Sequence, residues 1–155
     1  MKAAGLLFSL FLYLHPAGVI SQDKSFGAGL ILGEPTGISL KGWLTSTSAF
    51  DAGIAWSFVN PGSLQLHADY LHHMYKVIDV TTGKLPLYIG IGGRFKVKNK
   101  ENNADSRIGF RFPVGAAYLF AHAPVDIFVE VVPVFDLTPK VSLYVIAAMG
   151  ARYFF

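Results

Sequence analysis

Apolar residues alternate with other residues through almost the whole chain after residue 25, and this period of two is the strongest constraint on its fold. In a β-strand, successive side chains lie on opposite faces, so each alternating segment has one apolar face and one face of different character. Clusters of Gly, Pro, Asn, Asp and Ser separate the segments, as turns separate strands. The pattern predicts strands over residues 26–32, 38–44, 50–58, 64–72, 87–97, 108–118, 127–137 and 141–155.

The second face of these segments combines charges of both signs with many glycines. On a face in water, glycine would only weaken a strand. In a crowded interior, glycine makes room for long charged side chains, so we expect the apolar face to point outward into lipid. The charged residues and His67 of the second face are Lys41, Asp51, His67, Asp69, Arg94, Lys96, Arg107, Arg111, Asp126, Glu130, Asp136 and Arg152.

A sheet in lipid must close on itself, because an open edge would leave backbone N–H and C=O groups unpaired in hydrocarbon. The composition agrees with a lipid environment: 52% of the residues are hydrophobic and 15% are charged, against about a quarter charged in soluble domains. No stretch after residue 22 approaches the roughly 20 apolar residues of a spanning helix. We therefore expect an all-β protein, an eight-stranded antiparallel up-and-down transmembrane β-barrel over residues 22–155.

The N-terminus predicts a signal peptide over residues 1–21. Lys2 precedes the apolar run 3–14, which is followed by the chain-breaking Pro16 and Gly18 and by small residues around Ser21. A first helix or a membrane anchor is the alternative, but the apolar run is shorter than a spanning helix requires.

Charge and cysteine content exclude several classes of partner. The formal net charge is +3 and the basic residues are scattered, so the clustered basic face of a nucleic-acid-binding protein is missing. The chain has no cysteine, which excludes disulfides, a lipid-modified cysteine and thiolate metal sites. The expected partner is outer-membrane lipid, and the expected state is a monomer.

The interior of an eight-stranded barrel is just wide enough to be filled by side chains. Buried charges must be paired and hydrogen-bonded, so we expect a network of ion pairs centred on Glu130, Arg94 and Arg111. The residues assigned to this network are Lys41, Asp51, Asp69, Arg94, Arg111, Asp126, Glu130 and Arg152.

Two further groups of residues could carry chemistry. His67 and Asp69 share one strand face and could serve as a catalytic base pair or as two metal ligands, but no third partner is evident. We therefore assign no catalytic, metal or cofactor-binding residue and expect no enzyme activity. His72 and His73, with Tyr70 and Tyr75, are expected at the level of the lipid headgroups, with a pH sensor as the alternative.

Aromatic residues and one polar segment predict the two ends of the barrel. Residues 99–105 form the most polar loop and the best candidate for outside contact, with a loop that is merely solvated as the alternative. Aromatic residues sort to the two rims, as the girdles of membrane barrels do. One rim has Phe26, Phe50, Tyr118, Tyr153 and Phe155, and the other has Phe58, Phe95, Phe110 and Phe135.

Several motifs resemble those of a family of small bacterial outer-membrane β-barrels of uncharacterised function. These are GEPTGISLK at 33–41, DAGIAWS at 51–57, LHADY at 66–70 and PVG at 113–115. The segment GARYFF at 150–155 resembles the signal, here Tyr153 and Phe155, by which the outer-membrane assembly machinery recognises its clients. The resemblance implies the architecture of the OmpA transmembrane domain and of OmpX, but with short loops that argue against adhesion. It implies no catalytic residues.

Three classes of function are compatible with these features. We expect an integral outer-membrane barrel whose polar lumen is filled by side chains and whose role is structural or one of surface interaction. The alternatives are a narrow pore for small solutes and a membrane-embedded lipid-modifying enzyme.

Overall fold

The computed structural model describes residues 25–59, 61–100 and 103–155, so the expected signal peptide at 1–21 lies outside the described residues. The described chain is built of β-strands. They are β1 (Phe26–Gly33), β2 (Thr36–Trp43), β3 (Ser48–Trp56), β4 (Ser63–Met74), β5 (Leu87–Lys100), β6 (Asn103–Arg111), β7 (Val114–Leu119), β8 (Val125–Asp136) and β9 (Ser142–Phe154). No helix in the described residues is long and apolar enough to cross a membrane.

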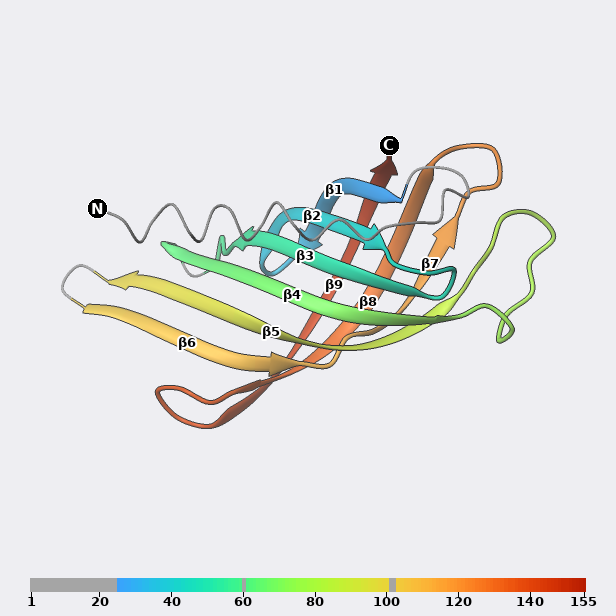
Figure 1. Ribbon diagram of the computed structural model, residues 1–155. Helices are drawn as coiled ribbons and strands as arrows, with labels where there is room; N and C mark the ends of the chain where they lie inside the picture. Colours follow the sequence, from blue (N-terminus) through green and yellow to red (C-terminus); the bar gives the residue numbers. More distant parts are fainter. Residues whose placement is uncertain (1–24, 60, 101–102) are drawn as a thin grey trace, which may run out of the picture.

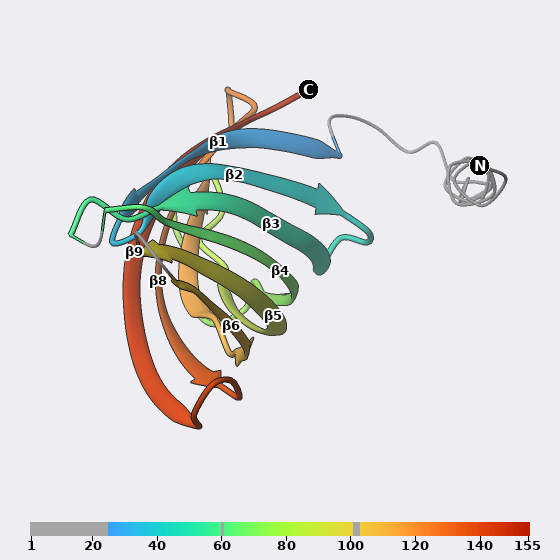
Figure 2. The ribbon, with the colours of Figure 1, turned by 90° about the vertical axis from the view of Figure 1, so that its left-hand side faces the viewer.

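The strands form one closed antiparallel ring (Figure 1). Neighbours in sequence pair from β1 to β5, β8 pairs with β9, and β9 pairs with β1. In Figure 2 the strands β1 to β6 follow one another around the wall, and β8 and β9 complete it. The pairing of β1 with β9 leaves no sheet edge, which confirms the predicted antiparallel barrel.

Strands β6 and β7 together fill one position in the wall, between β5 and β8. Pro113 separates them, because proline has no N–H to donate to the ladder. Arg111 pairs with Gly92 of β5, and Val114 pairs with Ile89 of β5, so both strands advance by three residues and the register is unbroken. The single strand predicted over 108–118 is therefore one interrupted strand, and the nine segments occupy eight positions.

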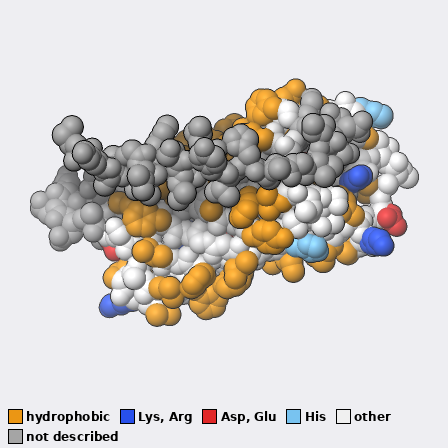
Figure 3. Space-filling model, in the orientation of Figure 1, with side chains coloured by type: hydrophobic (Ala, Val, Ile, Leu, Met, Phe, Trp, Pro, Cys, Tyr) orange, Lys and Arg blue, Asp and Glu red, His pale blue; other side chains and the backbone are white. Residues whose placement is uncertain are grey.

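Burial follows the alternation of the sequence. Along β4 every second residue from Ser63 to His73 is buried, and the residues between them are exposed. The exposed side chains in the barrel wall are mainly large and apolar, including Leu30, Ile54, Leu66 and Ile91. On the face shown in Figure 3, charged side chains lie near the two ends and hydrophobic ones between them. The described barrel thus has its apolar surface outside, as membrane barrels do.

The strand order assigns each connection to one of the two ends of the barrel. At the terminal end, where β1 begins and β9 finishes, lie the connections 44–47, 75–86 and 120–124. At the hairpin end lie the connections 34–35, 57–62 and 137–141, and the hairpin of β5 and β6. Of the first predicted set of aromatic residues, four lie on strands nearer the terminal end and Phe155 follows β9; of the second set, three lie on strands nearer the hairpin end and Phe58 lies in the connection 57–62.

One predicted loop is wrong. The composition of residues 99–105 predicts a polar loop, but β5 continues to Lys100 and β6 begins at Asn103. Their backbones stay paired up to Lys100 and Asn103. Cross-strand hydrogen bonds therefore override the turn-forming composition of this segment, since pairing satisfies backbone groups that a loop would leave to water.

The outward position of Ile91 predicts that a charged side chain introduced there strongly destabilises the barrel. Ile91 lies near the middle of the apolar row of β5. We expect Ile91→Arg to lower the free energy of unfolding by about 2–4 kcal/mol, because lipid cannot solvate the guanidinium. Urea titration of the barrel in phospholipid vesicles measures this change.

Ser106→Arg is the matched control, because Ser106 is exposed near the start of β6. Its expected cost is about 0–1 kcal/mol. If both variants lost the same free energy of unfolding, the prediction that the apolar face contacts lipid would be wrong.

Candidate functional site

The interior of the barrel is the candidate functional site, since it gathers the polar side chains of the second face. The buried polar residues are Ser39, Lys41, Ser48, Asp51, Ser57, Ser63, Gln65, His67, Asp69, His73, Arg94, Arg111, Asp126, Asp136 and Arg152. They share the interior with an apolar cluster formed by Ile31, Leu71, Tyr88, Ala117 and Phe128. Alternation along the strands places both sets inside, and their pairing decides what the lumen can do.

The terminal cluster consists of Lys41, Asp51, Asp126 and Arg152. Arg152 Nη1 donates to Asp51, and its Nε donates to Asp126 Oδ1 at 3.0 Å. Lys41 Nζ lies 3.8 Å from Asp126 Oδ2. The Arg152 guanidinium also lies 4.0 Å from the centre of the Phe128 ring. Two buried cations and two buried carboxylates therefore balance one another.

His73 extends this cluster and corrects a prediction. Its Nε2 lies 2.9 Å from Lys41 Nζ, and its Nδ1 lies 3.3 Å from the Thr47 carbonyl oxygen. Because an ammonium can only donate, Nε2 is the acceptor and Nδ1 carries the proton given to Thr47. His73 is buried while His72 is exposed, so the expected headgroup position is wrong for His73. Alternation along β4 turns it inward.

The middle cluster consists of Asp69, Arg111 and Glu130. Arg111 Nε donates to both carboxylate oxygens of Asp69, at 3.0 and 3.1 Å. Its Nη2 lies 3.0 Å from Asp69 Oδ2 and 3.8 Å from Glu130 Oε1. The Tyr88 hydroxyl donates to Glu130 Oε2 at 2.9 Å. Asp69 is thus the main partner of Arg111, and Glu130 is held mainly by Tyr88.

The hairpin cluster is the pair of Arg94 and Asp136. Arg94 donates through Nε to Asp136 Oδ1 at 2.9 Å and through Nη2 to Oδ2 at 2.6 Å. Its Nη1 donates to Gln65 Oε1 at 3.1 Å. Such a two-point guanidinium–carboxylate pair is the strongest form of ionic hydrogen bonding.

The structure places all eight residues of the predicted network inside the barrel wall but not around one centre. Arg111 and Glu130 lie together, whereas Arg94 pairs with Asp136 rather than with Glu130. The predicted network omits Asp136 and Gln65. A signal for Asp136 exists in the sequence, because it lies on the charged face of its segment, but alternation does not tell which charges meet.

In two of these ion pairs the partners come from strands on either side of a third strand, and a glycine of that third strand lies between them. Gly92 on β5 pairs with Asp69 on one side and with Arg111 on the other. A Cβ at Gly92 would lie 2.0 Å from Asp69 Oδ1. Gly109 on β6 lies in the same way between Arg94 and Asp136, and a Cβ there would lie 2.6 Å from Asp136 Oδ1. Glycine therefore leaves space for the side chains that meet above it.

His67 and Asp69 do not form a common reactive pair. His67 Nε2 lies 4.0 Å from Asp51 Oδ1, while Asp69 is bound by Arg111. His67 Nδ1 has no hydrogen-bond partner in the described structure. Among the described residues, no group of three or more His, Cys, Asp or Glu side chains is placed to hold a metal ion.

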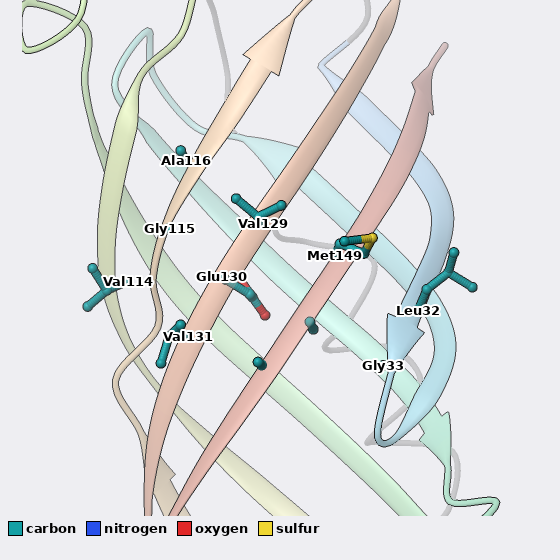
Figure 4. A pocket seen from close by; sticks show the side chains of 11 residues that line it. Leu32, Gly33, Val114, Gly115, Ala116, Val129, Glu130, Val131 and Met149 are labelled. Carbon is teal, nitrogen blue, oxygen red and sulfur yellow. The ribbon is translucent and has the colours of Figure 1, made fainter.

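A small void lies beside the middle cluster. A void of about 10 Å³ is lined by residues that include His67, Arg111, Gln65 and Glu130. This volume is about that needed for a single water molecule. A larger depression of about 630 Å³ lies on the outer wall over β1, β7, β8 and β9 (Figure 4). Apolar and small residues form most of its lining, so it is a feature of the outer apolar surface.

Comparison with solved structures supports the fold. No protein-family model matches the sequence, and no curated protein is significantly similar to it. The N-terminal β-barrel domain of Pseudomonas aeruginosa OprF is similar over 86% of this chain and 100% of that domain, with a TM-score of 0.69 and 12% identity. Neisserial surface protein A is similar over 84% of this chain and 94% of that protein, with a TM-score of 0.52 and 14% identity. The chain has the fold of a small bacterial outer-membrane β-barrel.

The pairing pattern predicts that Asp136 contributes more to the stability of the barrel than Glu130. We expect Asp136→Ala to lower the free energy of unfolding by about 3–5 kcal/mol, because Arg94 is left buried without its carboxylate. Glu130→Ala should cost only about 1–3 kcal/mol, the penalty for an unsatisfied buried polar group. Urea unfolding in detergent micelles, followed by tryptophan fluorescence, measures both. A larger loss for Glu130→Ala would place the centre of the network where the sequence predicts it.

The space around the glycines predicts that an added methyl group destabilises the barrel at one glycine and not at another. We expect Gly92→Ala to lower the free energy of unfolding by about 2–3 kcal/mol, because its Cβ displaces Asp69 from Arg111. At Gly42 nothing lies within 4 Å of the added Cβ, so Gly42→Ala is the control and should be nearly neutral. The same unfolding titration compares the two variants. Equal stability of both would show that Gly92 makes no room for the ion pair.

Proposed function

We propose that this protein is an integral barrel of a bacterial outer membrane, with a lumen closed by its own side chains and a structural or surface-interaction role. One observation carries the proposal: apolar side chains cover the outside of a closed ring, while the three ionic clusters fill the inside. A surface of this kind is stable in hydrocarbon, since no backbone edge and few charges meet the lipid.

The interior supports a plug in preference to a pore. The ion pairs join strands that are not neighbours: Asp51 of β3 meets Arg152 of β9, and Asp69 of β4 meets Arg111 of β6. Moving a solute through the centre would require these pairs to separate in a poorly hydrated space. Each separated buried charge would cost several kcal/mol.

The wall and the ends support contact with other molecules at the membrane surface. In the hairpin of β5 and β6 the described strands stay paired as far as Lys100 and Asn103, and the sequence there is polar. We also propose that Tyr153 and Phe155, both exposed on the outer face, contribute to recognition by the outer-membrane assembly machinery. Their rings lie in edge-to-face contact with centroids 5.4 Å apart.

Two alternatives remain from the sequence, a narrow pore and a lipid-modifying enzyme. An enzyme would need a reactive group that reaches a lipid, and His67 is a titratable side chain whose Nδ1 has no partner in the described structure. Lipid hydrolysis that disappears in His67→Ala would support the enzyme and contradict the proposal.

Conductance in a planar lipid bilayer tests the proposed closure. We expect the refolded protein to give no discrete current steps above the lipid background, because Arg94, Arg111 and Arg152 are locked in pairs across the lumen. A wide-pore porin reconstituted in the same way is the positive control. Reproducible steps from the folded, heat-modifiable protein would favour the narrow pore.

A further inference from the structure

A polar pocket lies in the mouth of the barrel at the hairpin end, next to the hairpin cluster of Arg94 and Asp136. Its volume is about 240 Å³, and it is lined by Lys96, Lys98, Asp105, Arg107 and Tyr144. These residues belong to β5, β6 and β9, on the rows that face the lumen. The pocket therefore opens at the end opposite the termini, above the pair of Arg94 and Asp136.

Like charges face each other in the pocket. Among the described residues that line it are Lys96, Lys98 and Arg107, together with the carboxylate of Asp105. Lys96 lies directly opposite Arg107 in the register of β5 and β6, and like charges in such positions repel. Arg94 lies on the same lumen-facing row two residues before Lys96, so it adds a second like charge near the Lys96 ammonium. No ion pair of Lys96 is found in the described part of the chain.

Arg107 is held in place yet remains accessible. Its Nη1 donates to the Tyr144 hydroxyl at 2.6 Å, and its Nη2 lies 3.5 Å from Asp105 Oδ2. Nη1 also lies 3.8 Å from Asp136 Oδ2, but Arg94 already donates to both oxygens of that carboxylate. About a third of the Arg107 side chain is exposed, 31%. A positioned guanidinium thus faces the pocket with donors to spare.

We propose that this pocket binds a phosphate group. A phosphate ester carries a charge of about −1.5 to −2 at neutral pH and three strong acceptor oxygens, which suits a pocket where the like charges of Lys96 and Arg107 face each other. Guanidinium and ammonium groups are the side chains that recognise phosphate most strongly. The phosphate can come from a soluble ion or ester, or from the headgroup of a phosphorylated lipid, since both present the same oxygens. The pocket exists whatever the role of the lumen, but its position at a membrane surface rests on the proposed membrane location.

Titration of the refolded full barrel with inorganic phosphate tests the proposal. In zwitterionic detergent and low salt, isothermal calorimetry should show saturable binding that weakens as the ionic strength rises. Lys96→Gln and Arg107→Gln should each weaken the affinity at least about tenfold, the effect of one lost charged hydrogen bond. Lys140→Gln is the control, because Lys140 is exposed at the same end but does not line the pocket. Heat-modifiable mobility verifies that each variant is folded.

A second arm distinguishes the source of the phosphate. The barrel is placed in phosphatidylcholine nanodiscs with and without phosphatidic acid, and the binding of phosphatidic acid is measured for the wild type and the same variants. Binding of inorganic phosphate that depends on Lys96 and Arg107 supports a soluble ligand. Binding of phosphatidic acid alone, with the same dependence, supports a lipid headgroup. No saturable binding in either arm, or equal binding by the wild type and both variants, overturns the proposal. The conductance measurement is independent, so failure of the plugged lumen would be recognised separately.

Discussion

The closed ring of backbone hydrogen bonds is the constraint on which the rest of the structure depends. The pairing of β1 with β9 removes the two edges that an eight-position sheet would otherwise expose. In hydrocarbon each unpaired backbone group costs several kcal/mol, so only a closed ring allows a sheet with an apolar outer face. Closure also fixes the width of the interior. Because eight positions enclose a space that side chains can fill, the second face of every strand must pack against its counterparts across the centre.

The interior satisfies this demand with ion pairs that connect distant parts of the wall. The carboxylates of Asp51 and Asp69 lie on adjacent strands in direct register, where like charges repel. Each is neutralised by an arginine from elsewhere in the ring, Arg152 and Arg111 respectively. The pairs tie together strands that share no hydrogen bonds with each other. They therefore stabilise the cross-section of the barrel, a property that backbone pairing between neighbours does not provide.

Glycine makes these connections possible. Gly92 and Gly109 each lie on the strand between two charged partners, and each leaves the space into which the partners reach. Glycine weakens a strand, but a side chain at either position would push the charged partners apart. The mouth at the hairpin end is different. There Lys96 and Arg107 lie directly opposite each other in the register of β5 and β6, so two cations repel each other where the lumen opens.

The sequence alone determined which face each residue occupies, because the side-chain direction in a strand depends only on its place in the alternation. It thereby specified the apolar exterior, the charged interior and the eight positions of the wall. Only the tertiary structure decided which charges meet: Arg94 pairs with Asp136, and His73 meets Lys41 inside the barrel. It also decided that residues 99–100 and 103–105 continue the pairing of β5 and β6. These outcomes depend on the register between strands and on the curvature of the ring, which bring together residues 42 positions apart in the chain. Alternation has no information about either, since every register that keeps the two faces separate satisfies it equally well.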